Sequence, residues 1–184
     1  MARGPEDVFD EYLVLLAADG SREAVADLVA RWSPRLLRHA MRLLHDLDAA
    51  KDVTQDTWVG ALRGLRSLGD PARFPAWIYA IASRKCADRI RSNMRRRRLR
   101  AAIVAQPRPV SCDPELGRGL DLSAALGRLP FDQRLVVSLF YGEDLTVSDI
   151  ARVVGAAEGT IKSRLHHARA ALKGHLEEGQ NDRD

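Results

Sequence analysis

The carboxylates of Asp52 and Asp56 are the first residues of this sequence whose type and spacing suggest chemistry. They stand four positions apart, so they share one face of a helix, and Gln55 lies beside them. Two carboxylates on one face can hold a metal ion or act as general acid and base. No third ligand stands nearby, and neither a glycine-rich loop nor a nucleophile motif accompanies the pair. An acidic surface that docks on a basic protein partner therefore fits the pattern better.

Cations dominate a later stretch, from Arg84 to Arg100, which holds nine Lys or Arg residues and one acid. It ends in the run IRSNMRRRRLR, residues 90–100. Such a run alone is typical of a solvated tail, a transport signal or the charged end of a nucleic-acid-binding helix. Trp77 and Tyr79 precede it on the same predicted helix. Rings stack on exposed bases while cations follow the backbone, so the combination favours single-stranded nucleic acid, with burial of both rings as the alternative.

A third group of polar side chains occurs at helical spacing in residues 159–173. Its outward positions are Thr160, Ser163, His166 and His167, flanked by Lys162, Arg164 and Arg169. Hydroxyls, imidazoles and cations on one face suit the major groove of duplex DNA. Before this helix, Thr146 can cap a short helix and Gly155 permits a tight turn, as in a helix-turn-helix. An ordinary helical bundle with a solvated basic face is the alternative.

The elements that must position these residues are helices, because apolar spacing is helical nearly throughout the chain. Ser21 is expected to cap a first helix over 21–32, and Ser33 a second over 33–46, with Pro34 at its first position. The remaining helices are predicted over 46–68, 75–98, 117–129, 131–142, 146–155 and 158–176. An all-α fold follows.

The pattern breaks over residues 101–117, where three prolines, a serine and a glycine fall close together. This composition is typical of an interdomain linker. The sequence therefore predicts two small helical domains, residues 1–100 and 118–178, joined by a flexible linker and followed by a polar tail over 179–184.

Composition narrows the class of protein. The chain has 184 residues, 46% of them hydrophobic, which is enough for packed cores. Its two cysteines, Cys86 and Cys112, are too few for a disulfide framework, and no Cys/His cluster has zinc spacing. We therefore expect a reduced intracellular protein with inert thiols and without a metal or cofactor. No apolar stretch is long enough to span a membrane, and MARGPEDVFD lacks the apolar core of a secretory signal.

Charge is distributed unevenly. Residues 1–30 hold seven acids and two arginines, whereas the stretch that ends at Arg100 is strongly basic. One acidic and one basic surface indicate two different partners.

Three segments, taken together, resemble the bacterial sigma-70 family, and specifically its extracytoplasmic-function (ECF) sigma factors. They are AVADLVARWSPRLLRHAMRLLHDLDAAKDVTQDTWVGAL, RFPAWIYAIASRKCADRIRSNMRRRR and ALGRLPFDQRLVVSLFYGEDLTVSDIARVVGAAEGTIKSRLHHARAAL. The first two resemble sigma domain 2, which binds the polymerase core and melts and recognises the −10 element. The third resembles sigma domain 4, a helix-turn-helix that recognises the −35 element. The resemblance implies a promoter-specificity subunit of RNA polymerase that is not itself an enzyme.

The resemblance also implies roles for individual residues. Core polymerase would be bound through its β′ clamp by Asp52, Gln55 and Asp56, and also through its β flap. The loop from Ser67 to Phe74 would hold a flipped base of the −10 strand. Contacts to the −10 region would come from Ser67, Asp70, Arg73, Phe74, Trp77, Arg84, Lys85, Arg89 and Arg91. Contacts to the −35 duplex would come from Thr160, Lys162, Ser163, Arg164 and His167.

Further partners are promoter DNA and an anti-sigma factor, as is common in the family. The expected location is cytoplasmic, with attachment to the membrane only through an anti-sigma partner. Two other classes of protein remain open at this point. A stand-alone helix-turn-helix regulator would lack the first domain in this form, and a nucleic-acid-modifying enzyme would need a metal or nucleophile constellation.

Overall fold

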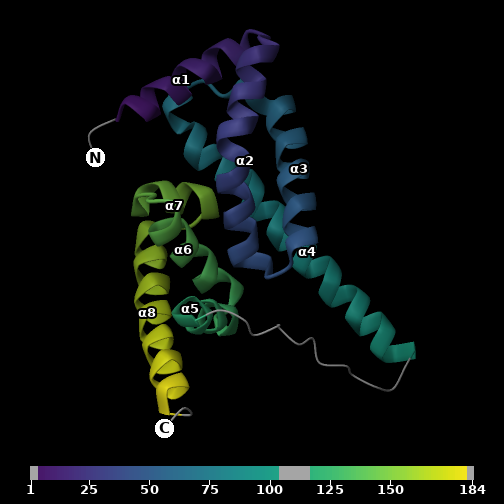
Figure 1. Ribbon diagram of the computed structural model, residues 1–184, viewed down its shortest axis with the longest axis vertical. Coiled ribbons are helices and arrows are strands. Elements are labelled where there is room, and N and C mark those ends of the chain that lie inside the picture. Colours follow the sequence, from purple (N-terminus) through teal and green to yellow (C-terminus); the bar gives the residue numbers. More distant parts are fainter. Residues whose placement is uncertain (1–3, 104–116, 182–184) are drawn as a thin grey trace.

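The computed structural model describes residues 4–103 and 117–181, and every regular element within these ranges is a helix (Figure 1). The side chains of 97, 100–103, 117–121, 123 and 176–181 are outside this description. The N-terminal domain contains α1 (Pro5–Ala18), α2 (Arg22–Leu44), α3 (Leu47–Gly64), the 3₁₀ turns η1 (Leu65–Ser67) and η2 (Pro71–Arg73), and α4 (Phe74–Ile103). The C-terminal domain contains α5 (Gly117–Arg128), α6 (Phe131–Gly142), α7 (Val147–Val154) and α8 (Glu158–Asn181). The expectation of two all-α domains is confirmed.

Most of the predicted linker, with Cys112, lies outside the described residues, as does the end of the tail. The described residues resume at Gly117, the first residue of α5. Helix α4 continues to Ile103, beyond its predicted end at residue 98 and into the first residues of the predicted linker. The predicted domain boundaries themselves stay a prediction.

Helix α2 differs from the prediction of two helices that meet at Ser33. It runs without interruption through Pro34, because the apolar stripe continues in register on both sides of the proline. Leu28, Trp32 and Leu36, four positions apart, are each 1% exposed. Burial of this stripe outweighs the cost of about 3 kcal/mol that proline brings to a helix interior. The hydroxyl of Ser33, predicted as a cap, instead accepts a hydrogen bond from Trp58 Nε1 at 3.0 Å.

Helix α1 was not predicted, although its start carries ordinary signals. Gly4 is its N-cap and Pro5 its first residue, and the Asp7 carboxylate accepts a hydrogen bond from the Gly4 amide at 3.0 Å. The helix is attached to α2 through the buried carboxylate of Asp10. This group accepts hydrogen bonds from Arg31 Nε at 2.8 Å and from Trp32 Nε1 at 3.1 Å. Apolar residues occupy both the buried and the exposed faces of α1, which hides the helical period.

The core of the N-terminal domain is built around Trp32. The Phe74 ring lies edge-on to it at 5.1 Å between centroids, and the Tyr79 ring at 5.9 Å. Aromatic pairs prefer this geometry because the positive edge of one ring meets the negative face of the other. Helix α4 therefore begins from a fixed position against α2, and this placement determines where its later side chains point.

The helix-turn-helix of the C-terminal domain has the predicted caps. Thr146 Oγ1 accepts a hydrogen bond from the Asp149 amide at 3.1 Å at the start of α7. Gly155 ends α7 with φ +70°, the left-handed conformation that glycine adopts without strain. Ile150 and Ile161 are fully buried, so α7 and α8 share one core with α6.

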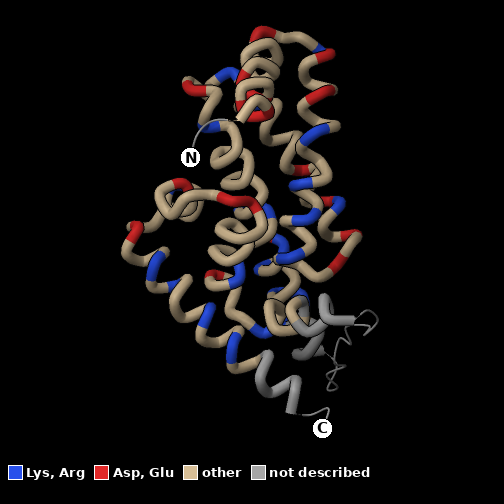
Figure 2. Tube along the Cα trace, turned by 60° about the vertical axis from the view of Figure 1, so that its left-hand side comes forward, with Lys and Arg blue, Asp and Glu red and all other residues tan. Residues whose placement is uncertain are grey.

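The two domains are in contact in this structure. Helices α6 and α7 lie against α2 and α4, as Figure 1 shows beside α2. The acidic end of the molecule is at α1, away from the C-terminal domain's α8, along which Lys and Arg recur towards the C-terminus (Figure 2).

Candidate nucleic-acid interface

The predicted core-binding residues lie together on the exposed face of α3. Asp52, Gln55 and Asp56 are all exposed. Asp52 Oδ2 also pairs with Arg89 Nη2 of α4 at 3.4 Å, while its side chain remains 61% exposed. The ion pair is open to solvent and contributes little to stability, so the carboxylate stays available to a partner.

Two apolar side chains extend this acidic face and were not predicted as part of it. Val59 is 44% exposed and Leu62 is 46% exposed, and both follow Asp52 and Gln55 at helical spacing. Helical spacing does not distinguish them from core positions, because Leu62 also continues the buried pattern of Ala61 and Leu65. Exposed apolar residues beside acids are typical of a protein-docking surface.

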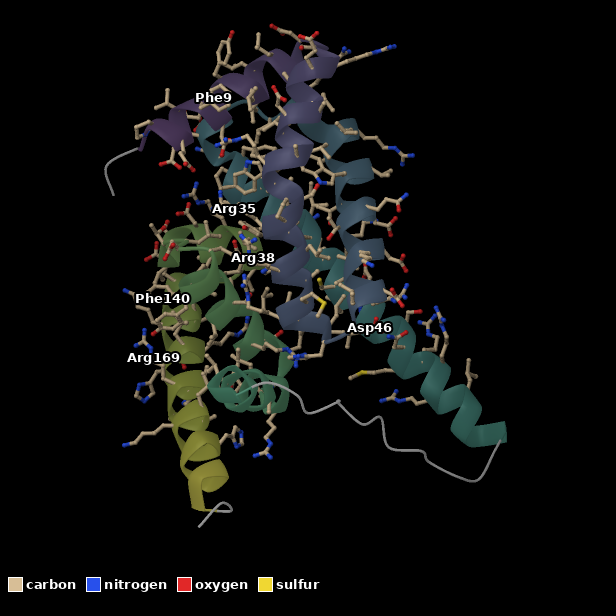
Figure 3. The ribbon with its side chains drawn as sticks, viewed as in Figure 1. Phe9, Arg35, Arg38, Asp46, Phe140 and Arg169 are labelled. Atoms are coloured by element: carbon tan, nitrogen blue, oxygen red, sulfur yellow. The ribbon has the colours of Figure 1, made fainter. Side chains whose placement is uncertain are left out.

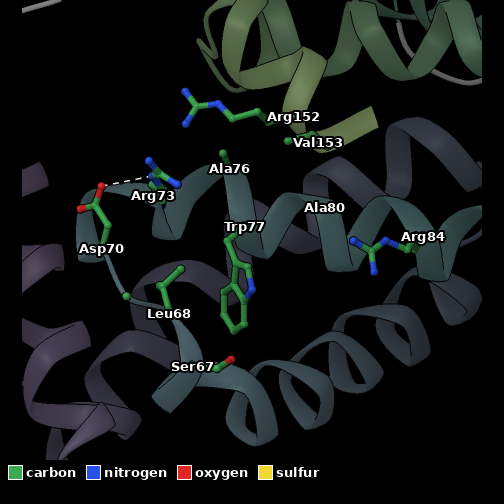
Figure 4. A pocket seen from close by; sticks show the side chains of 11 residues that line it. Ser67, Leu68, Asp70, Arg73, Ala76, Trp77, Ala80, Arg84, Arg152 and Val153 are labelled. Atoms are coloured by element: carbon green, nitrogen blue, oxygen red, sulfur yellow. Dashed lines mark ion pairs between the residues drawn. The ribbon is translucent and has the colours of Figure 1, made fainter. Parts of the chain in front are cut away.

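Five of the predicted −10 residues surround one cavity of about 500 Å³ at the start of α4 (Figure 4). They are Ser67, Asp70, Arg73, Trp77 and Arg84. The wall is completed by Leu68, Gly69, Ala76 and Ala80, so apolar surface lies between the polar groups. A cavity of this size with few convergent polar groups can hold a small planar group such as a nucleobase.

Local structure positions the loop at the mouth of this cavity. Asp70 caps η2 by accepting a hydrogen bond from the Ala72 amide at 3.1 Å. The same carboxylate pairs with Arg73 Nε at 3.2 Å, the ion pair drawn in Figure 4. Because both groups are more than half exposed, the pair orders the loop without removing its charges from solvent.

The aromatic residues divide between the cavity and the core. Trp77 is half-buried on the cavity wall, with its ring against Gly64 of α3. Phe74 is 1% exposed and Tyr79 is fully buried, so neither ring can stack on a base in this structure. For Tyr79 the core alternative is the one observed, and Phe74 is corrected from a DNA contact to a core residue. Helical spacing placed Phe74 and Tyr79 near Trp77 on α4. It could not show which side of α4 packs against the other helices.

The cations of α4 differ in exposure. Arg84 is exposed at the cavity, whereas Lys85 and Arg89 are half-buried. Arg91 is exposed and pairs with Asp88 at 2.5 Å. Met94 is 56% exposed, because α4 has by then passed the end of the bundle (Figure 1). The predicted cations therefore follow one helix away from the cavity.

The predicted −35 residues share the outer side of α8. Thr160, Lys162, Ser163 and His167 are exposed. Arg164 is half-buried and its Nη2 pairs with Asp132 Oδ2 of α6 at 2.9 Å. Below them, Arg169 donates a hydrogen bond to the Tyr141 hydroxyl at 2.7 Å and lies near Phe140 (Figure 3). This face is basic and has hydroxyl groups, as groove binding requires.

The C-terminal domain reaches the cavity of the N-terminal domain. Arg152 and Val153 of α7 lie on the rim of the cavity, above Ala76 and Arg84 in Figure 4. Two domains that were predicted to contact different parts of a DNA molecule are thus in contact at this cavity.

In the part of the chain that the structure describes, no three His, Cys, Asp or Glu side chains come together as ligands for a metal ion. None of the helices in residues 4–103 and 117–181 is sufficiently long and apolar to cross a bilayer.

Comparison with known proteins places this geometry in context. The model of sigma-70 region 2 matches residues 28–96, and that of sigma-70 region 4 matches residues 119–172. ECF RNA polymerase sigma factor SigM of Mycobacterium tuberculosis is 32% identical over 184 residues, 98% of this chain and 92% of that protein. ECF RNA polymerase sigma factor SigL of the same organism is 34% identical over 147 residues, 78% of this chain and 83% of that protein.

Two solved structures are also similar. CnrH, in complex with the cytosolic domain of CnrY, has a TM-score of 0.68 at 30% identity, covering 91% of this chain and 97% of that chain. The sigma factor RpoE of Bartonella quintana, in complex with the anti-sigma factor NepR, has a TM-score of 0.65 at 28% identity. That match covers 83% of this chain and 96% of the other.

Proposed function

This chain belongs to the ECF members of the sigma-70 family of RNA polymerase sigma factors, and we propose that three of its surfaces divide the work of promoter-specific initiation. The chain binds the RNA polymerase core and directs it to promoters. Its relatives are sigma factors rather than enzymes, and the polymerase carries out the chemistry. A stand-alone helix-turn-helix regulator is not favoured, because the match to region 2 spans residues 28–96 of the first domain.

The exposed face of α3 is the surface that we assign to core polymerase. Asp52, Gln55 and Asp56 supply the polar contacts to the β′ clamp, and Val59 and Leu62 supply apolar area beside them. Charge complementarity steers the encounter and fixes the register, while the apolar area contributes affinity.

The cavity between η1 and α4 is the site that we assign to a base of the −10 element. A base that leaves the stack loses pairing and stacking worth a few kcal/mol, and capture in a fitted cavity offsets part of this loss. Trp77 offers a ring on the wall, while Arg73 and Arg84 can neutralise the flanking phosphates. Lys85, Arg89 and Arg91 continue this basic path along α4.

The outer face of α8 is the surface that we assign to the −35 duplex. Thr160, Lys162, Ser163, Arg164 and His167 lie on it, and a recognition helix reads base edges from such positions. Arg164 would have to exchange its ion pair with Asp132 for a phosphate or a base edge.

An anti-sigma factor is the regulatory partner that we infer. RpoE of Bartonella quintana is bound by such a protein, and this chain is similar to RpoE over most of its length. The chain would then act in the cytoplasm, and a membrane-anchored partner would hold it at the membrane.

The observation that carries the proposal is the gathering of the predicted residues on three exposed surfaces of a sigma-type fold. The experiment is promoter-dependent transcription with core polymerase, comparing wild type with Asp52→Arg combined with Asp56→Arg. Reversing both charges should weaken core binding by about tenfold or more, since truncation of central interface charges commonly costs 1–3 kcal/mol. Asp27→Arg, at an exposed position of α2, is the matched control and should bind core normally.

Circular dichroism should show unchanged helix content in both variants. Unchanged core affinity of the double variant would remove α3 from the docking surface. A wild-type chain that binds duplex DNA tightly but neither binds core nor supports initiation would contradict the proposed function as a whole.

A further inference from the structure

The carboxylate of Glu143 is a charged group of the C-terminal domain that is buried against the N-terminal domain. The residue follows α6, and its side chain is 3% exposed. Arg42 of α2 donates a hydrogen bond to Oε1, and the Tyr79 hydroxyl of α4 donates one to Oε2. Both oxygens are thus satisfied by the other domain, as a buried charge requires.

Three arginines of the N-terminal domain act on this carboxylate, and one of them, Arg35, also lines a pocket with Glu6 and Asp10. Arg35, Arg38 and Arg42 recur at helical spacing on α2, and Figure 3 shows Arg35 and Arg38 on the side facing the C-terminal domain. Burial raises the pKa of Glu143, whereas the Tyr79 hydrogen bond and the charges of the three arginines lower it. The guanidinium of Arg35 is held over the Trp32 ring, 4.4 Å from its centroid. The site is therefore organised around an anion.

The fit of the two domains at this point is close. Arg42 Nε also donates to Ser138 Oγ of α6 at 3.0 Å. A Cβ atom added to Gly142 would lie 2.7 Å from the Arg42 guanidinium, so a residue without a side chain permits the approach. The end of α6 thus holds the Glu143 carboxylate at a defined place on α2.

This place is next to the cavity assigned to the −10 base. Tyr79, which binds Glu143, is followed on α4 by Ala80, which lines that cavity. Arg152 and Val153 of α7 reach the cavity rim in the same arrangement. A nucleic acid that enters the cavity along α4 would meet the C-terminal domain at this rim, and movement of that domain would free Arg42 and the Tyr79 hydroxyl from Glu143, beside the exposed Arg38.

We propose that Arg35, Arg38, Arg42 and the Tyr79 hydroxyl form a phosphodiester-binding site of the N-terminal domain, which Glu143 occupies until a nucleic-acid strand displaces it. A phosphodiester matches the site because guanidinium groups bind phosphate and carboxylate oxygens in the same geometry. Identification of the strand as promoter DNA rests on the proposed function, but the anion site itself does not. While Glu143 occupies this site, a chain that is not bound to core polymerase does not bind DNA there.

The test compares wild type with Glu143→Gln in binding to a short mixed-sequence single-stranded DNA. Glutamine keeps the shape, removes the competing charge and replaces one of the two accepting oxygens with an amide NH2 that donates. Affinity should rise about fivefold or more, the usual size of coupling between two sites. The logarithm of affinity should also depend more steeply on the logarithm of salt concentration, by about 0.7 for each phosphate gained. Glu23→Gln, an exposed carboxylate of α2, is the matched control and should leave the salt slope unchanged.

Arg38 provides the second arm because it is exposed and its loss should not disturb folding. Arg38→Gln should weaken strand binding and cancel most of the gain in the double variant with Glu143→Gln. Arg22→Gln, also exposed on α2, should not cancel it. Inorganic phosphate is a further probe, because it can compete for an anion site without being a strand. Millimolar phosphate that displaces the DNA supports the site, and phosphate without effect on Glu143→Gln contradicts it.

Three further results would overturn the proposal. The first is an unchanged affinity and salt slope in Glu143→Gln, and the second is a gain that persists without Arg38. The third is a Glu143→Gln variant that gains affinity for a poly-glutamate peptide but not for DNA, which would assign the site to an acidic protein. None of these assays contains core polymerase or a promoter, so failure here is distinguishable from failure of the transcription experiment.

Discussion

At the scale of single residues, His39 is a buried polar group at the contact between the domains. Its side chain is fully buried, with Nδ1 3.2 Å from Ser138 Oγ of the C-terminal domain and Nε2 3.2 Å from Ser83 Oγ of α4. Burial, and then the charge of Arg42, lower the pKa of His39 from 6.5 to about 3. The imidazole is therefore neutral in the folded protein at neutral pH.

The lowered pKa predicts loss of stability in acid. Between the unfolded pKa of 6.5 and the folded pKa of about 3, the unfolded chain binds more protons than the native one. The free energy of unfolding should consequently fall as pH falls through this range, by up to about 1.4 kcal/mol per pH unit. In His39→Gln, which has an amide that does not titrate, the thermal midpoint should decline less steeply from pH 7 to pH 4. Parallel declines in the two proteins would show that His39 does not contribute.

Cys86 allows a second prediction at this scale. The thiol is fully buried, and burial raises its pKa to about 12, against a smaller lowering by Arg134. The thiolate is the reactive form, so Cys86 should resist alkylation at about pH 8 until the protein unfolds. The measurement needs Cys112→Ser, so that one thiol is followed by mass spectrometry with and without urea. Fast labelling of the native variant would mean that Cys86 is accessible.

At the scale of elements, the turn between α7 and α8 depends on Gly155. The residue has φ +70°, and a Cβ atom added there would meet nothing within 4 Å, so the cost of a side chain is purely conformational. Gly155→Ala should destabilise the C-terminal domain by about 1–2 kcal/mol. Gly174→Ala is the control, because it also has open space but lies in the interior of α8, where alanine should stabilise the helix by up to about 1 kcal/mol. Urea unfolding should shift in opposite directions, and equal shifts would contradict the role of the turn.

The helix-turn-helix, α2 and α1 show which sequence signals predict structure and which do not. Thr146 and Gly155 predicted the helix-turn-helix correctly, because caps and turns act locally. The break predicted at Ser33 was wrong, because capping signals compete with burial and the burial of α2 prevails. Helix α1 was missed because Val8 and Tyr12 place apolar side chains on its exposed face, which removes the period.

At the scale of the whole molecule, the sequence predicted the sets of residues but not their arrangement. Resemblance to a family named the residues around the cavity, yet the cover supplied by Arg152 and Val153 had no sequence signal. Arg42 and Glu143 are about 100 positions apart and each occupies a polar position that local patterns assign to solvent. Contacts between domains depend on shape complementarity over many residues, which neither period nor spacing records.

Gly142 offers a direct test of this arrangement. Alanine there should favour α6 itself, because glycine costs a helix about 1 kcal/mol. Its Cβ atom would, however, displace the Arg42 guanidinium from Glu143 and Ser138, so the contact between domains should weaken while the C-terminal domain does not. A loss of about 1 kcal/mol would raise the ratio of open to closed molecules about fivefold.

Spin labels at the exposed positions 23 and 148, one in each domain, would report this as a longer distance distribution. Gly174→Ala adds the same methyl group where nothing lies within 4 Å, and it should leave the distribution unchanged. If Gly142→Ala gave the same distances as this control, Arg42 would accommodate the methyl group without releasing Glu143, and closure would not depend on the approach at Gly142.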